Sequence, residues 1–197
     1  MIVTGIRALG FAAALSLTAI VAAQAAGDHE PMLRAVGDKD VKPWLADTAI
    51  VDAIKAQNAK HAGLTQDQID VMDKAWRAEV KSGSGKMVDA VPANALSQYL
   101  KQRKEASQGL FTEIFVMDNK GLNVGQSDVT SDYWQGDEAK WKNTFLVGAG
   151  GVDVSAIETD ESTQTLQSQL SLPVVDPADG SVIGAITLGV NVEQLGG

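Results

Sequence analysis

The chain has 197 residues, with 25 acidic and 16 basic side chains, no cysteine and a formal net charge of -9. This length suits one domain, since a single core usually serves roughly 100–200 residues. The missing cysteines exclude disulfide scaffolds, thiolate metal sites and thiol catalysis. The acidic excess argues against nucleic acid and anionic membranes as partners, because both reward clustered Lys and Arg. We expect neither a metal nor a cofactor.

Residues 1–26 have the pattern of a secretory signal. Arg7 is the only charge, an apolar run extends from Ala8 to Ala23, and Ala23-Gln24-Ala25 has the form of a cleavage site. The run is short and rich in alanine for a membrane span, which needs about 20 strongly apolar residues. We therefore expect a periplasmic or secreted protein with no membrane span in its mature form. Retention of the segment as an anchor is the alternative.

Residues 41–106 have the apolar spacing of three helices, and residues 27–40 are expected to form a tail before them. The second helix begins at a capping box, Thr65–Gln68, and ends at Ser82–Gly85. The third runs from about Pro92 to Ala106, because proline suits a first helical turn. The first helix presents one face made of Trp44, Thr48, Val51 and Ile54.

Residues 110–194 switch to the alternating pattern of strands. Turn sequences at Asp118–Gly121 and Asp176–Gly180 predict two hairpins, so the pairing is antiparallel. Helices followed by strands predict an α+β fold, with the N-terminal helices packed on a PAS-like, five-stranded antiparallel sheet. The five strands are expected at residues 111–117, 122–126, 152–158, 166–172 and 182–190.

An aromatic and acidic insertion, residues 131–145, separates the second and third strands. Asp137 and Glu138 stand where a short helix would begin, since carboxylates favour its positive end. Trp141 and Phe145 then follow at i and i+4, on one side of that helix. The insertion therefore predicts a short helix with an aromatic face.

The insertion also has the composition of a ligand site. Its candidate residues are Asp132, Tyr133, Trp134, Lys140 and Trp141. Aromatic rings supply rigid walls and a face for cations, while a few polar groups fix the orientation of a ligand. Asp132 would accept hydrogen bonds from an amine or hydroxyl, and Lys140 would pair with an acidic group. Alternatively, the tryptophans seat the short helix on the sheet; we favour this for Trp141 and leave it open for Trp134.

Several segments together resemble the single-Cache type of the Cache (PDC) family of extracellular, PAS-like sensor domains. They are Asn58–Arg77, Phe115–Gly121, Thr130–Glu138, Leu172–Asp176 and Gly180–Gly184. The resemblance covers nearly all of the chain after the secretory segment. It implies a pocket between sheet and insertion that binds an amino acid, an amine, a purine or a short carboxylate. The arginine that shortly follows an Asp-Tyr pair in the family's amino-acid motif is missing here.

The leading functional hypothesis is a soluble exported sensory module that signals through a separate envelope receptor or kinase. The alternative is a Cache-like interaction scaffold or regulator of an envelope protein, without a ligand of its own. The resemblance also leaves a homodimer open, since the long helices of related sensors often pair. We do not expect an enzyme, because no spacing singles out a catalytic pair among Asp132, Asp137, Glu138, Asp160 and Glu161.

Overall fold

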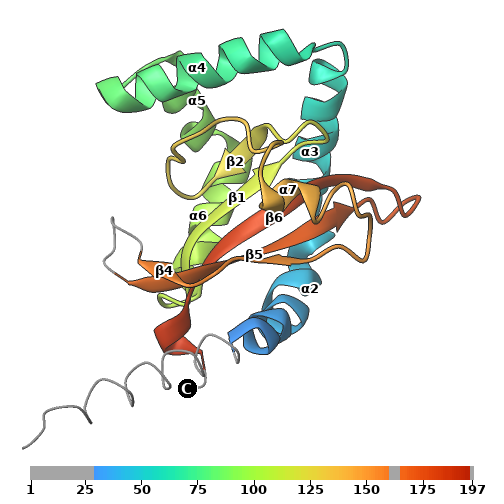
Figure 1. Ribbon diagram of the computed structural model, residues 1–197. Coiled ribbons are helices and arrows are strands. Elements are labelled where there is room, and N and C mark those ends of the chain that lie inside the picture. Colours follow the sequence, from blue (N-terminus) through green and yellow to red (C-terminus); the bar gives the residue numbers. More distant parts are fainter. Residues whose placement is uncertain (1–28, 160–164, 196–197) are drawn as a thin grey trace, which may run out of the picture.

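The computed structural model describes residues 29–159 and 165–195 (Figure 1). The predicted secretory segment, residues 1–26, and the turn at residues 160–162 lie outside the described residues. Residues 29–36, within the predicted tail, are helical, and Leu33 is fully buried. Across the two described ranges, no helix combines the length and hydropathy that a membrane span requires.

The predicted first helix is divided. A π-helical turn, η1 (Gly37–Val41), leads into α2 (Lys42–Leu45), and α3 (Thr48–His61) follows after a break. Asp47 takes an extended conformation, with ψ of 136°, and its carbonyl accepts the first hydrogen bonds of α3. The expected continuous face through Trp44 was therefore wrong, because the chain changes direction before Thr48.

The second predicted helix is confirmed as α4 (Gln66–Ser82), which begins with the capping box of Thr65 and ends at Gly83 in the left-handed conformation. The start of the third was misplaced. Pro92 lies inside a separate helix, α5 (Lys86–Ala93), and α6 (Ala95–Ala106) begins after it. Asn94 is extended and its side chain accepts the Ser97 amide, so it caps α6 and prevents continuity with α5.

The predicted α+β class and antiparallel pairing are confirmed. The sheet has the order β2-β1-β6-β5-β3, and β4 also pairs with β5. The expected strand at residues 152–158 is two short strands, because Ser155 interrupts the ladder by accepting the Gln169 amide on its side-chain Oγ. The strands are β1 (Phe111–Met117), β2 (Asn123–Gln126), β3 (Asp153–Val154), β4 (Glu158–Thr159), β5 (Leu166–Val175) and β6 (Val182–Asn191).

Different elements pack on the two faces of the sheet. Helices α3 and α6 lie behind it in Figure 1, and the insertion with α7 (Ala139–Lys142) lies in front. Because strand side chains alternate, Ile186, Leu188 and Val190 belong to the core on the helical side. Ala185, which precedes Ile186 and faces the other way, packs with the insertion's Trp141. The insertion is thus built against the second face of the sheet.

Candidate functional site

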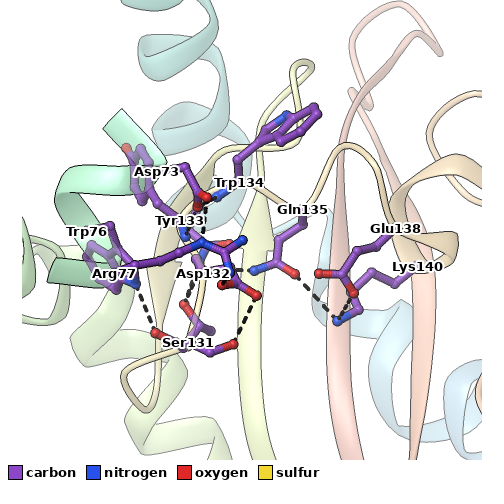
Figure 2. A network of polar contacts seen from close by, with 12 residues as sticks. Asp73, Trp76, Arg77, Ser131, Asp132, Tyr133, Trp134, Gln135, Glu138 and Lys140 are labelled. Atoms are coloured by element: carbon purple, nitrogen blue, oxygen red, sulfur yellow. Dashed lines mark hydrogen bonds and ion pairs between the residues drawn. The ribbon is translucent and has the colours of Figure 1, made fainter. Parts of the chain in front are cut away.

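The start of the insertion is fastened to α4 by Asp73, whose side chain is almost fully buried. One carboxylate oxygen of Asp73 accepts the backbone amides of Tyr133 at 2.9 Å and Trp134 at 3.0 Å (Figure 2). One turn away, the indole of Trp76 donates to the carbonyl of Thr130 at 2.9 Å. Helix α4 therefore fixes the backbone of residues 130–134.

The same helix supplies a cation to the insertion. The guanidinium of Arg77 donates from Nε to Asp73 Oδ2 at 2.7 Å, and its Nη1 lies 2.5 Å from Asp132 Oδ1. The hydrogen bond with Asp73 raises the pKa of Arg77 above its ordinary value, so the guanidinium remains charged. Ser131 donates to the other oxygen of Asp132 at 3.0 Å.

The insertion passes over the β1–β2 turn at a close contact between two glycines, Gly121 and Gly136. Gly121 has φ of +80°, and a Cβ there would lie 2.5 Å from Gly136 Cα. The Gln135 amide donates to the Gly121 carbonyl at 2.7 Å, and the Trp134 indole donates to the Lys120 carbonyl at 2.8 Å. Side chains at either glycine would separate the two backbones, so this crossing sets the height of the insertion above the sheet.

A hollow of about 220 Å³ lies between the insertion and the sheet. Sheet residues on β1 and β5 form its floor, and residues 129–140 form its walls. The side chains relevant to chemistry are Glu113, Phe115 and Gln169 from the sheet, with Asp132, Gln135, Glu138 and Lys140 from the insertion.

The floor of this insertion pocket is polar because the strands carry polar residues on that face. Glu113 and Gln169 both stand opposite Gly189 of β6. Without a side chain between them, Gln169 Nε2 donates to Glu113 Oε1 at 2.8 Å. At the next cross-strand pair on the same face, the hydroxyls of Ser171 and Thr187 are hydrogen-bonded at 2.9 Å, and both residues are fully buried.

Lys140 brings an ammonium group to the pocket. Its Nζ lies 2.8 Å from Glu138 Oε2, 3.4 Å from Gln135 Oε1 and 5.5 Å from the centre of the Phe115 ring. The Lys140 side chain is only 15% exposed. An ammonium held over an aromatic face in a partly buried hollow is a suitable partner for an anionic group of a ligand.

The pocket carries more negative than positive charge. Three carboxylates line it, those of Glu113, Asp132 and Glu138, against the single ammonium of Lys140. Arg77 reaches Asp132 without being part of the lining. This balance favours a ligand that brings its own cation, because a cleft lined by one sign of charge attracts the opposite charge.

Two of the five candidate residues, Asp132 and Lys140, meet in this pocket. The other three lie outside its lining. The ring of Tyr133 packs against Trp76, with centroids 5.4 Å apart, and burial raises the pKa of the Tyr133 hydroxyl. A ligand role for all five stays a prediction, and the geometry concentrates it on Asp132 and Lys140.

The two tryptophans support the insertion. Trp141 donates to the carbonyl of Asp118 at 3.2 Å and stacks on Phe145 at 5.0 Å, which confirms the expected i, i+4 contact. Trp134 packs beside the α4 cluster that contains Ile69. Both indoles thus have partners within the chain.

Sequence reasoning did not place Asp73, Arg77, Glu113 or Gln169 in the site. A signal was present for Asp73, which lies among the apolar positions of α4's buried face, where an unpaired carboxylate would be costly. Glu113 is the one charged residue of β1, and Gln169 is one of several polar residues of β5. Only the sheet order brings these two together across Gly189.

A second hollow of about 380 Å³ lies between α2 and the loop before β3, and is lined mainly by apolar side chains such as Leu45, Val152 and Pro173. The insertion pocket is the better candidate, because binding sites combine a cavity with convergent polar groups. Within the described part of the chain, no cluster of three or more His, Asp and Glu residues is arranged to hold a metal ion.

No protein-family model matches the chain, and no curated protein matches it in sequence. Solved structures do. The sensor domain of the V. cholerae histidine kinase DctB has a TM-score of 0.45 and 16% identity, over 91% of this chain and 59% of that one. The ligand-binding domain of the Pseudomonas aeruginosa amino acid chemoreceptor PctC, in complex with GABA, has a TM-score of 0.41 and 16% identity, over 85% and 63%.

The ligand-binding domain of the Campylobacter jejuni chemoreceptor Tlp3, in complex with 4-methylisoleucine, has a TM-score of 0.39 and 13% identity. That match covers 77% of this chain and 62% of the other. All three are sensory or ligand-binding domains. This chain spans about 60% of their length. At these identities and TM-scores, the function of this chain has to be argued from its own residues.

Proposed function

We propose that the chain is a sensory module of Cache type that binds a small ammonium-bearing molecule, an amino acid or an amine, in the insertion pocket. The observation that carries the proposal is the pocket's charge: three carboxylates and one ammonium above a polar floor. The proposed activity is binding, without a chemical step. The proposed setting is the periplasm or the cell exterior, with an envelope receptor or kinase as the partner that receives the signal.

The chemistry of the walls narrows the ligand classes. A ligand ammonium would lie near Asp132 and Glu113, and a ligand carboxylate near Lys140. The volume of about 220 Å³ lies below the roughly 300–1,000 Å³ of typical ligand pockets, so the ligand is small. Purines are disfavoured because Tyr133 and Trp134 pack elsewhere, and simple carboxylates are disfavoured by the acidic balance.

A thermal-shift experiment tests the proposal, because a ligand that binds only the native state stabilises it, by about 2.7 kcal/mol at a concentration of 100 Kd. The probes are 4-aminobutyrate, butylamine and butyrate, which share a chain length and differ in charged groups. We expect 4-aminobutyrate and butylamine to raise the melting temperature and butyrate to have little effect.

Two acidic residues of the insertion provide matched variants. Asp132→Asn removes a carboxylate of the pocket and should abolish the stabilisation by butylamine. Asp137→Asn removes an exposed carboxylate outside the lining and should leave it unchanged. Stabilisation by butyrate alone, or an equal loss in both variants, would contradict the proposal.

A second candidate function, the interaction scaffold without a ligand, is favoured by the pairing of the pocket's own charges. Lys140 pairs with Glu138, and Asp132 pairs with Arg77. In that case no probe would shift the melting temperature, and Lys140→Met would lower stability in the absence of any ligand.

A further inference from the structure

Arg77 pairs with two carboxylates, Asp73 and Asp132, that have different structural roles. Asp73 belongs to Arg77's own helix, where the i, i+4 spacing keeps the pair together, and it holds the backbone of Tyr133 and Trp134. Asp132 belongs to the insertion and lines the pocket. Figure 2 shows the Arg77 side chain extending from α4 toward Asp132, beside Asp73.

The single carboxylate of Asp132 therefore belongs to the pocket lining and also contacts Arg77 of α4. Its Oδ1 atom is buried and accepts no hydrogen bond from the described residues, while Arg77 Nη1 lies 2.5 Å away as its charge partner. The Arg77 side chain is 56% exposed, so solvent surrounds much of the guanidinium. Arg77 can leave Asp132 without losing its second partner, Asp73.

We infer that Arg77, Asp73 and Asp132 form a latch, in which Arg77 occupies Asp132 as an internal cation until a ligand ammonium displaces it and leaves it paired with Asp73 alone. This inference rests on the proposed function, since it needs an ammonium-bearing ligand in the pocket. It makes Arg77 a determinant of affinity and specificity that does not itself touch the ligand. It also gives α4 a contact that differs between the empty and the occupied pocket.

The latch has a thermodynamic consequence that can be measured. Ligand ammonium and Arg77 compete for Asp132, so each weakens the binding of the other by the same factor. Removing the guanidinium should strengthen the binding of an amine. A residue that only stabilised the fold would have the opposite effect or none.

Calorimetric titration with butylamine and butyrate tests the latch in the full-length chain. We expect Arg77→Gln to bind butylamine at least about fivefold more tightly than the wild type, the lower end of typical coupling between sites. Butyrate should bind no better to the variant. Lys74→Gln is the matched control, since it removes an exposed cation three residues earlier on α4 and should leave both affinities unchanged.

Other outcomes overturn the inference in distinguishable ways. Wild-type binding of butylamine with equal or weaker binding by Arg77→Gln would overturn the latch and leave the proposed function standing. Equal tightening in Lys74→Gln would show an effect of net charge alone and overturn it too. Failure of the wild type and both variants to bind butylamine would reject both ideas.

Arg77→Lys keeps the experiment decisive if Arg77→Gln does not fold. Lysine retains the charge, but a single ammonium cannot match the planar fork that guanidinium presents to two carboxylates. We expect this variant to tighten butylamine binding by a smaller factor than Arg77→Gln. Unchanged affinity in a folded Arg77→Lys protein, with Arg77→Gln unfolded, would count against the latch.

Discussion

Replacing Asp73 by alanine should detach the insertion from α4. The change leaves the buried amide of Tyr133 and the half-buried amide of Trp134 without their acceptor. Hydrogen bonds to a charged group contribute about 1.5–3 kcal/mol each. The bond to Arg77 adds little, because that side chain is 56% exposed. With some relaxation toward water, we expect a loss of about 3 kcal/mol, a large part of a typical domain stability of roughly 5–15 kcal/mol.

Urea unfolding followed by tryptophan fluorescence measures this loss, since Trp76 and Trp134 both lie at the detached contact. Asp70→Ala is the control on the same helix: its side chain accepts an exposed hydrogen bond from Gln66, so its loss should stay within about 0.5 kcal/mol. Asp73→Asn keeps one oxygen for the two amides, so its loss of stability should lie between those of Asp73→Ala and Asp70→Ala. A loss for Asp73→Ala within about 1 kcal/mol of the control would refute this account of how the insertion is held.

Three further predictions concern the crossing, a pH effect and the pocket cation. Gly121→Ala should lower the melting temperature well beyond Gly180→Ala, because both positions have positive φ but only Gly121 meets another backbone, which calorimetry can check. The hydrogen bond from Lys55 lowers the pKa of Asp176, so the pair's contribution is present above the ordinary pKa, about 3.9, and is lost as the pH falls through the lowered folded value. The stability difference between wild type and Lys55→Met should therefore close on acidification below that pH, and a difference constant down to pH 2 would contradict it. Lys140→Met should abolish any preference for 4-aminobutyrate over butylamine in titrations, and a retained preference would place the carboxylate elsewhere.

The parts of the fold that could be predicted from sequence are those set by neighbouring residues. The capping box at Thr65, the stop at Gly83 and the strand alternation in β6 depend on contacts within a few positions. The break at Asp47 and the cap at Asn94 were missed, because polar residues that are common on helix surfaces act there as starts of new helices. Local pattern alone does not separate these two uses of a polar residue.

The sequence indicated which segment would line a pocket, but not which of its side chains would point into it. The sequence predicted a ligand site in the insertion, and two of its five candidate residues, Asp132 and Lys140, line a hollow there; their ligand role stays a prediction. The orientation of Tyr133 and Trp134 was not predictable, because it is fixed by Asp73, about 60 positions earlier in the chain. Once that carboxylate holds both amides, Tyr133 packs on Trp76, and the pocket keeps polar walls instead of aromatic ones.

The most direct test of the central claim is an NMR titration of the wild-type chain with 4-aminobutyrate, observing the side-chain amides of Gln135 and Gln169. These two amides stand on opposite sides of the insertion pocket, one on the insertion and one on β5. We predict that both signals shift together with one dissociation constant. Unchanged signals from both amides, with shifts instead at Leu45 and Val152 around the apolar hollow or with no shifts at all, would contradict the assignment of the ligand to this pocket.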